Sequence, residues 1–164
     1  KREGTTITIY LPASNTEVIE DKKPSKAVVK GTGTIMLTDD EEMIIDVAKQ
    51  MLEKLGYMVL VAKSGREAIT LYEKNKADIG MVILDMIMPS MSGGDTYDRL
   101  KEINPDIKVL LSTGYSINGQ AQEILDRGCN GFIQKPFNMK ELSQRISKIL
   151  DKDKVYGKLK NTHI

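Results

Sequence analysis

The segment MVILDMIMP, residues 81–89, contains four apolar residues followed directly by Asp85. An apolar run of this length is typical of a strand that is buried on both faces, as the strands of parallel sheets are. Because the carboxyl ends of parallel strands meet at one edge of a sheet, polar side chains that follow such runs are expected to converge there. Three other apolar runs lead into polar residues: 34–37 into Asp39 and Asp40, 109–111 into Thr113, and 131–133 into Lys135.

Helical periodicity alternates with the apolar runs from about residue 33 onward. Five βα units with short connections require right-handed crossovers, which predicts a doubly wound α/β fold with a five-stranded parallel sheet covered on both faces. The predicted strands lie at about 33–38, 57–62, 79–84, 107–112 and 130–134. The predicted helices are one that ends near residue 55 and others at about 65–75, 94–103, 118–127 and 139–151.

Apolar spacing and capping residues define several of these helices. In the first helix, one apolar stripe is predicted to face the core, and Gly56 is predicted to end the helix. Ser64 is predicted to begin the second helix, while Asn138 and Glu141 form a capping-box pattern at the start of the last. The stripe of the first helix consists of Ile44, Val47, Ala48, Met51, Leu52 and Leu55.

The first thirty residues differ in composition from the rest of the chain. Residues 5–11 alternate and are rich in β-branched side chains, which predicts a strand that needs partners elsewhere. Residues 13–31 have the polar, proline-containing composition of a linker. We therefore expect a globular domain over residues 32–151, followed by a polar tail at 152–164.

Bulk composition excludes several functions. The chain has 164 residues and a net charge of +1 with acids and bases interspersed, so no surface for nucleic acid or for an anionic membrane is predicted. The single cysteine excludes an internal disulfide and fits a reducing compartment. The sequence shows no signal peptide and no stretch with the roughly 18 apolar residues of a membrane span, so we expect a cytoplasmic protein.

The predicted cluster of acids suits a divalent metal ion. Mg²⁺, or Mn²⁺ in its place, prefers oxygen ligands and commonly uses one or two carboxylates. Asp40 and Asp85 can supply these carboxylates, and Asp39 can hold a metal-bound water. Carboxylates gathered at one place repel one another, and a divalent cation would compensate that repulsion.

The same cluster provides groups for phosphoryl transfer. Asp85 is the candidate nucleophile because carboxylates form acyl phosphates. Lys135 is a compact cation suited to a phosphate oxygen, and the hydroxyl of Thr113 can hydrogen-bond another. Pro136 lowers the cost of a cis peptide bond, which would direct Lys135 into the site.

Each of these residues also has a purely structural interpretation. Asp39 and Asp40 could be acids of a helix first turn, and Asp85 could be a turn residue at the end of a strand. Thr113 could be a turn hydroxyl and Lys135 a solvated surface charge. The positions together favour the functional interpretation, since an acid at the end of a buried strand is costly without a purpose.

Four short motifs over residues 33–150 resemble those of two-component response-regulator receiver domains. They occur in the family's order and at similar spacing, although each motif alone is a weak signal. The resemblance implies a flavodoxin-like (βα)5 fold with the strand order 2-1-3-4-5. The motifs are LTDDE at 37–41, ILDMIMP at 83–89, LSTGY at 111–115 and FIQKPF at 132–137.

The resemblance also implies roles for single residues. Asp85 would accept a phosphoryl group from a phosphohistidine, with Mg²⁺ on Asp40, Asp85 and the backbone carbonyl of Ile87. Thr113 and Phe132 would form a switch pair that changes a protein-interaction surface. Phe132 departs from the family pattern in lacking the hydroxyl that a tyrosine would bring.

Residues 4–12, GTTITIYLP, are similar to the last strand of the ATP-binding domain of sensor histidine kinases. Together with the receiver motifs, this similarity implies that residues 1–12 are the terminal strand of such a domain in a hybrid histidine kinase. The implied partner is a phosphohistidine donor, either a histidine kinase domain, such as the chain's own kinase core, or a phosphotransfer protein. We expect a monomer or a weak dimer.

Other functions compete with the receiver interpretation. A phosphatase of the haloacid-dehalogenase type would need a second aspartate two residues after Asp85, where Ile87 stands. A flavin-binding protein would need a phosphate-cradling loop after the first strand, and the sequence shows none there. The alternative left open is a receiver-like docking module that regulates its own kinase independently of phosphorylation.

Overall fold

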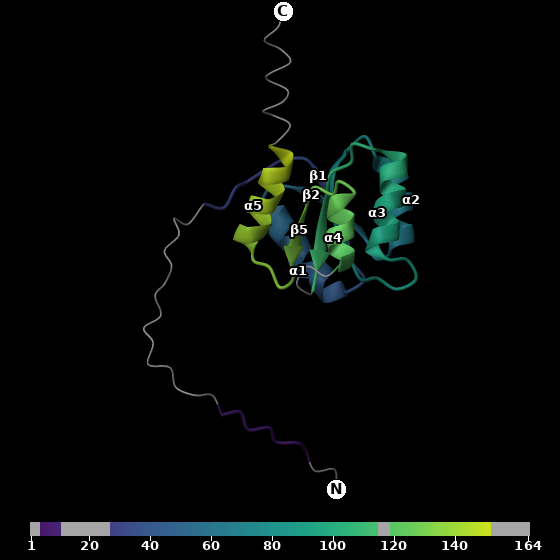
Figure 1. Ribbon diagram of the computed structural model, residues 1–164. Helices are drawn as coiled ribbons and strands as arrows, with labels where there is room; N and C mark the ends of the chain where they lie inside the picture. Colours follow the sequence, from purple (N-terminus) through teal and green to yellow (C-terminus); the bar gives the residue numbers. More distant parts are fainter. Residues whose placement is uncertain (1–3, 11–26, 115–118, 152–164) are drawn as a thin grey trace, which may run out of the picture.

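The apolar runs form a five-stranded parallel sheet in the computed structural model, which describes residues 4–10, 27–114 and 119–151 (Figure 1). The strand order is β2-β1-β3-β4-β5, and all four neighbouring pairs are parallel. The predicted fold class and strand order are therefore confirmed. The strands are β1 Thr34–Thr38, β2 Met58–Ala62, β3 Ile79–Asp85, β4 Val109–Thr113 and β5 Gly131–Gln134.

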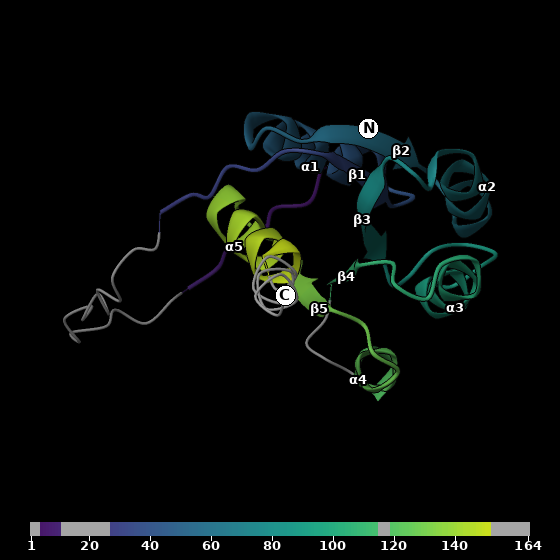
Figure 2. The same cartoon turned by 90° about the horizontal axis from the view of Figure 1, so that it is seen from above.

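Five helices in the described part of the chain cover the two faces of this sheet. Seen along the sheet, α1 and α5 lie on one face, and α2, α3 and α4 lie on the other (Figure 2). Among the described residues, no helix is long and apolar enough to cross a membrane. The helices are α1 Glu42–Lys54, α2 Gly65–Asn75, α3 Gly93–Ile103, α4 Gly119–Asp126 and α5 Met139–Leu150.

Each face of the sheet has its own hydrophobic core. Ile83 and Leu110 belong to the core beneath α1 and α5, whereas Val82 and Leu111 belong to the core beneath α2, α3 and α4. Successive residues of a strand point to opposite faces, so this alternation assigns the buried strand residues to one core or the other.

The buried face of α1 differs from the predicted stripe. Val47 is 48% exposed, whereas Ile45, outside the predicted stripe, is 5% exposed. The contact face is centred on Ile45, Ala48 and Leu52, and Val47 lies about 100° around the helix axis from Ala48. The prediction is wrong at Val47 because the helix carries two adjacent apolar rows, and only packing decides which row meets the sheet.

Side-chain caps begin two helices where the sequence predicts them. At α2, the Ser64 hydroxyl accepts a hydrogen bond from the Glu67 N–H at 3.2 Å. At α5, Asn138 Oδ1 accepts from the Glu141 N–H at 3.0 Å, and the Glu141 carboxylate accepts from the Asn138 N–H at 3.2 Å. The predicted capping box is confirmed, and a cap of this kind contributes about 1 kcal/mol to helix stability.

Within this chain, the described part of the predicted strand at residues 5–11 forms no strand, and the pairing with a partner elsewhere stays a prediction. Residues 4–10 carry no secondary structure, and each of them is exposed. A strand needs a neighbour that supplies ladder hydrogen bonds, and none pairs with this segment in the described part of the chain. Leu11, residues 13–26 of the predicted linker and the predicted tail at 152–164 lie outside the described residues.

Residues 27–33 lead into β1 past α5 and the end of α1. The Val29 N–H donates to Ser143 Oγ at 3.3 Å, and the Gly31 N–H donates to the Leu55 carbonyl at 2.9 Å. A Cβ on Gly31 would fall 1.9 Å from the hydroxyl oxygen of Tyr57. This stretch of the predicted linker is therefore held against the domain, and a side chain at position 31 would require the Tyr57 ring to move.

Candidate functional site

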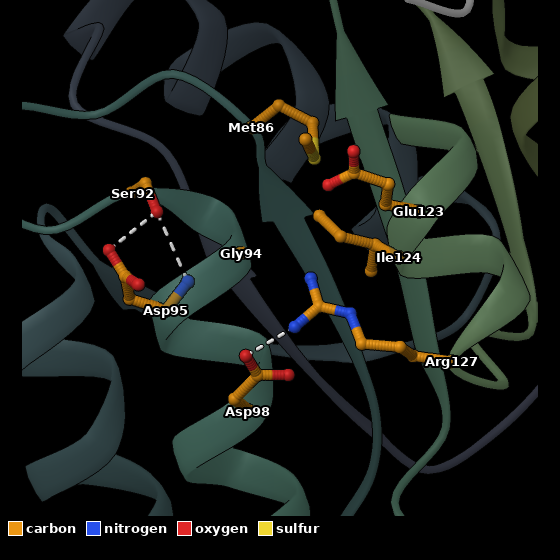
Figure 3. A pocket seen from close by; sticks show the side chains of 8 residues that line it. All are labelled: Met86, Ser92, Gly94, Asp95, Asp98, Glu123, Ile124 and Arg127. Atoms are coloured by element: carbon orange, nitrogen blue, oxygen red, sulfur yellow. Dashed lines mark hydrogen bonds and ion pairs between the residues drawn. The ribbon is translucent and has the colours of Figure 1, made fainter. Parts of the chain in front are cut away.

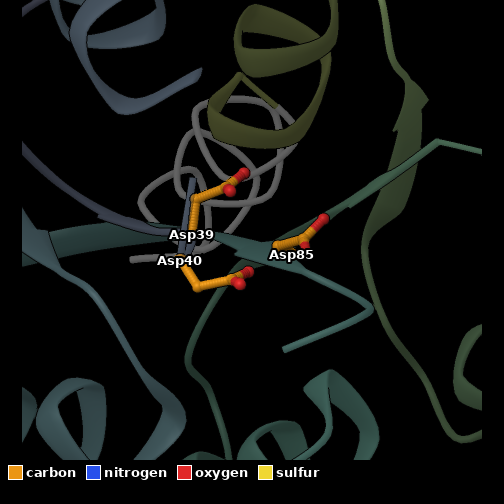
Figure 4. Close-up of side chains that lie close together, drawn as sticks. All are labelled: Asp39, Asp40 and Asp85. Carbon is orange, nitrogen blue, oxygen red and sulfur yellow. The ribbon is translucent and has the colours of Figure 1, made fainter. Parts of the chain in front are cut away.

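The carboxyl edge of the sheet brings the three predicted acids together. Asp39 follows β1 directly, Asp40 is next in the chain, and Asp85 is the last residue of β3. One carboxylate oxygen from each lies within 4.8 Å of the others (Figure 4). Asp39 and Asp85 are 1% and 5% exposed, while Asp40 is open to solvent. The cluster therefore has two buried carboxylates, Asp39 and Asp85, and opens to solvent on the side of Asp40.

Lys135 joins the cluster from the end of β5. Its Nζ lies 2.7 Å from Asp39 Oδ2 and 2.8 Å from Asp85 Oδ1, and its side chain is 12% exposed. The Glu41 carboxylate lies 3.9 Å away at the rim. The peptide bond between Lys135 and Pro136 is cis, as the sequence predicts. The ammonium group thus bridges two buried carboxylates.

Burial and charge act against each other in this cluster. Burial is the largest influence on the pKa of Asp85 and raises it. The hydrogen bond and charge of Lys135 lower this pKa, while the charge of Asp39 raises it. The net result is a pKa above the ordinary value. Burial lowers the pKa of Lys135, but its hydrogen bonds to Asp39 and Asp85 and their charges outweigh burial and raise it. The folded state therefore holds a firmly protonated lysine beside a carboxyl group whose ionisation is costly.

Backbone groups orient the two buried acids. The Glu41 N–H donates to Asp39 Oδ1 at 3.1 Å, and the Ile87 N–H donates to Asp85 Oδ2 at 3.2 Å. Both carboxylates therefore use one oxygen for Lys135 and the other for a backbone donor. The Ile87 side chain is 61% exposed, and the metal-ligand role of its backbone carbonyl stays a prediction.

The predicted switch residues lie on the two neighbouring strands. Thr113 ends β4 and is 4% exposed, and its carbonyl accepts a hydrogen bond from the Lys135 N–H at 2.7 Å. Phe132 lies on β5 and is half-buried, with the Arg145 guanidinium 5.3 Å from the centre of its ring. Lys135 thus connects the Thr113 backbone to the acidic cluster, whereas Phe132 packs against the core beneath α2, α3 and α4.

Gly93 holds α3 against the end of β3, a role that sequence reasoning did not assign. Its N–H donates to the Met86 carbonyl at 3.1 Å, and a Cβ there would lie 2.3 Å from the Asp85 carbonyl oxygen and 2.8 Å from Met86 Cα. Because these are backbone atoms, they have little freedom to move away. The glycine pair at 93 and 94 was the available signal, but it does not show which glycine makes the contact.

The Gly93→Ala variant is expected to lose about 3 kcal/mol of unfolding free energy, since the added methyl group must displace the end of β3. Gly94→Ala is the matched control, because its Cβ would meet only ordinary contacts, the nearest being Ile124 Cδ1 at 3.5 Å. Alanine is also the better helix former, so the control should be neutral or slightly stabilising. Urea unfolding curves measure both; equal stability of the two variants would contradict the close approach.

A pocket whose lining includes none of the three acids lies between α3 and α4 (Figure 3). Within it, Arg127 forms an ion pair with Asp98, and the Ser92 hydroxyl donates to Asp95 Oδ2 at 2.7 Å. The ion pair ties the end of α4 to α3. The pocket is lined by Met86, Ser92, Gly94, Asp95, Asp98, Glu123, Ile124 and Arg127, none of which belongs to the predicted site.

Comparison with known sequences gives one family over most of the domain. The chain matches the response regulator receiver domain over residues 35–147. It is 31% identical over 159 residues to the sensor kinase CckA of Brucella abortus, which covers 92% of this chain and 17% of that protein. It is 32% identical over 122 residues to the response regulator SaeR of Staphylococcus aureus, which covers 74% of this chain and 52% of that protein. The chain therefore spans only part of both curated relatives.

Solved structures agree with the sequence match. A receiver domain protein from Clostridium thermocellum superposes with a TM-score of 0.71 at 31% identity, covering 76% of this chain and 98% of that one. The response regulator TrrA from Thermotoga maritima, solved in complex with Mg²⁺ and BeF, has a TM-score of 0.65 at 29% identity, covering 72% of this chain and 99% of that one. These matches cover nearly the whole of each solved receiver.

Proposed function

This chain belongs to the response regulator receiver domain family, and we propose that its Asp85 accepts a phosphoryl group from a phosphohistidine. The supporting observation is the cluster at the carboxyl edge of the sheet, where Asp39, Asp40 and Asp85 gather within 4.8 Å. Lys135 Nζ lies 2.8 Å from Asp85 and supplies the positive charge that phosphoryl transfer requires. Phosphoryl transfer depends mainly on positioning and charge neutralisation, and this cluster offers both.

The acidic cluster fits a divalent cation of the Mg²⁺ type. Its donors are hard carboxylate oxygens from three residues that lie close enough to share one ion. Asp40 and Asp85 would bind the ion directly with the backbone carbonyl of Ile87, and Asp39 would hold a coordinated water. Such an ion supplies charge neutralisation for the phosphoryl oxygens. Mn²⁺ prefers the same donors.

The residues of the chain account for the transfer step. A carboxylate oxygen of Asp85 forms the new O–P bond while the N–P bond of the phosphohistidine breaks, and the imidazole nitrogen keeps that electron pair. Lys135 moves its hydrogen bond from Asp85 to a phosphoryl oxygen. Asp39, 2.7 Å from Lys135 Nζ, keeps the ammonium group in place during this exchange.

Thr113 and Phe132 are proposed as the switch pair. The Thr113 hydroxyl would donate to a phosphoryl oxygen on Asp85, because β4 and β3 are neighbouring strands. That hydrogen bond would shift the population between two packings of Phe132, whose ring now lies under Arg145 of α5. The surface that changes would comprise α4, β5 and α5, where we expect a protein partner to dock.

The proposed function predicts a gain of one phosphoryl group, about 80 Da, on incubation with acetyl phosphate and Mg²⁺, because acyl phosphates form on carboxylates. Intact mass spectrometry measures the gain. EDTA should abolish it, and alkaline hydroxylamine should remove the added group, as expected of an acyl phosphate. A folded, Mg²⁺-replete protein with no mass gain from acetyl phosphate or from a phosphorylated histidine kinase would contradict the proposal.

We also propose that the chain is the carboxyl-terminal part of a hybrid sensor histidine kinase, with residues 1–12 as the terminal strand of its ATP-binding domain, 13–31 as linker and 32–151 as receiver. In support, the similarity to the sensor kinase extends over 159 residues, well beyond the receiver match at 35–147. The donor would be that kinase's phosphohistidine or a phosphotransfer protein. Sequencing the gene upstream of residue 1 tests this origin; a start codon immediately before Lys1 would contradict it.

A further inference from the structure

Two buried hydroxyl groups in the described part of the chain have no hydrogen-bond partner: Thr38 Oγ1 and Ser112 Oγ. They are 1% and 3% exposed, and both lie at the carboxyl ends of strands. A buried hydroxyl without a partner destabilises the state in which it is unpaired, so each needs a physical explanation. Their surroundings differ because they point to opposite faces of the sheet.

Ser112 stands beside the proposed phosphoacceptor. In the parallel register it pairs with Asp85 on β3 and with Ile133 on β5. It lies two residues after Leu110, so its side chain points into the core beneath α1 and α5, to which Leu110 and Ile133 belong. Asp85, Ser112 and Ile133 thus form one row of register partners across β3, β4 and β5. In this row the Ser112 hydroxyl has the aliphatic Ile133 side chain on one side and the Asp85 carboxylate on the other.

Lys135 passes over the same strand. It follows β5, yet its ammonium group bonds to Asp85 on β3, and β4 lies between these two strands. Asp85 Oδ1 accepts from Lys135, and Asp85 Oδ2 accepts from the Ile87 N–H. In this state, both carboxylate oxygens already have donors, one of them a charged donor stronger than a hydroxyl.

We propose that Ser112 is a positioning residue that donates a hydrogen bond to Asp85 once Asp85 is phosphorylated. This inference rests on the proposed function. Phosphorus bonds to Asp85 Oδ2 and draws Lys135 to the phosphoryl oxygens, so Oδ1, now the carbonyl oxygen of the acyl phosphate, loses its charged hydrogen-bond donor. The Ser112 hydroxyl, adjacent in the same row and otherwise unpaired, fills that place. It is unpaired before phosphorylation and paired after, so it shifts the equilibrium toward the phosphorylated packing.

The Ser112→Ala variant is expected to have opposite effects on the stability of the unphosphorylated and phosphorylated states. Without ligand, its unfolding temperature is expected to rise by about 2–4 °C, because an unpaired buried hydroxyl is removed. Its apparent affinity for beryllium fluoride in the presence of Mg²⁺, the phosphoryl mimic present in the Thermotoga maritima complex, is expected to fall about fivefold. Thermal unfolding with Mg²⁺ alone and with Mg²⁺ plus beryllium fluoride measures both quantities.

Thr38→Val is the matched control. It removes an equally buried and unpaired hydroxyl, but Thr38 lies two residues after Met36 and so faces the core beneath α2, α3 and α4. Its unfolding temperature should change equally with and without beryllium fluoride. Ser112→Thr keeps the hydroxyl and should retain the wild-type affinity for the mimic.

The positioning role of Ser112 and the phosphorylation of Asp85 on which it rests can fail separately in this experiment. If wild-type protein gains stability from Mg²⁺ and beryllium fluoride and Ser112→Ala gains as much, the hydroxyl has only a structural role and the inference is wrong. If wild-type protein itself gains nothing, the proposed function fails and the inference fails with it. An opposite change in the two states, confined to Ser112→Ala, supports the positioning role.

Discussion

The Asp85→Asn variant is expected to gain no phosphoryl group under conditions in which wild-type protein is modified. The amide oxygen of asparagine is a poor nucleophile. The neighbouring acids Asp39 and Asp40 follow β1 and not β3, so we do not expect them to accept the phosphoryl group in place of Asp85. Intact mass spectrometry after incubation with acetyl phosphate and Mg²⁺ measures the loss, which should be complete.

Asp78→Asn is the control for this variant, because the substitution changes the net charge by the same amount. Asp78 is exposed and lies just before the opposite end of β3. It should be phosphorylated like wild type. A full mass gain in Asp85→Asn would place the acceptor on another residue and would overturn the assignment of Asp85.

The loss in Asp85→Asn should not come from unfolding. Burial raises the pKa of Asp85 above its ordinary value, so the folded state binds this proton more tightly than the unfolded state does. The ionised carboxylate therefore destabilises the fold at a pH above its folded pKa, and this cost disappears as the pH falls through that pKa. The neutral amide avoids the cost, and we expect a variant at least as stable as wild type near neutral pH.

The Lys135→Met variant is expected to lose about 3–5 kcal/mol of unfolding free energy at neutral pH, because Asp39 and Asp85 lose their buried cation. The pKa of Asp85 should rise further, since Lys135 is the main influence that lowers it. The loss should therefore shrink as the pH falls and the carboxyl groups bind protons. Mg²⁺ should restore part of the stability by supplying another cation. Urea unfolding near pH 7 and pH 5, with and without Mg²⁺, measures these effects.

Lys63→Met is the control for the loss of a lysine in an ion pair. Lys63 pairs with Glu42 at 2.5 Å, but both side chains are exposed, so the change in stability should be small and independent of Mg²⁺. A Lys135→Met variant as stable as Lys63→Met at neutral pH would show that the buried carboxylates do not depend on Lys135.

The sequence was sufficient to predict the acidic cluster but not its internal arrangement. Asp39, Asp85 and Lys135 could be placed at one edge because each stands where an apolar strand ends, and parallel strands end at the same edge. That rule gives no distances. The bridge in which one ammonium group serves both Asp39 and Asp85 depends on how far the Lys135 side chain reaches across β4.

Two local patterns depend on a partner that the sequence does not specify, and one of the two predictions, at Val47, is wrong. The alternation in residues 5–11 has the composition of a strand, but no neighbour pairs with residues 4–10 in the described part of the chain. In α1, two adjacent apolar rows are present, and the sheet selects the row containing Ile45 over the row containing Val47. Composition limits which structures a segment can form, and tertiary contacts determine which of them it forms.

The order of elements, the parallel sheet and the edge that carries the acids follow from the sequence alone, because hydrophobic period and strand-end position are local properties. The close approach of Gly93 to the Asp85 backbone and the unpaired hydroxyl of Ser112 beside Asp85 follow only from the tertiary structure. Asp85 and Ser112 lie on different strands, and a two-residue period gives the face of each but not its neighbour across the sheet. The register between strands supplies that neighbour, and it is determined by how both cores pack.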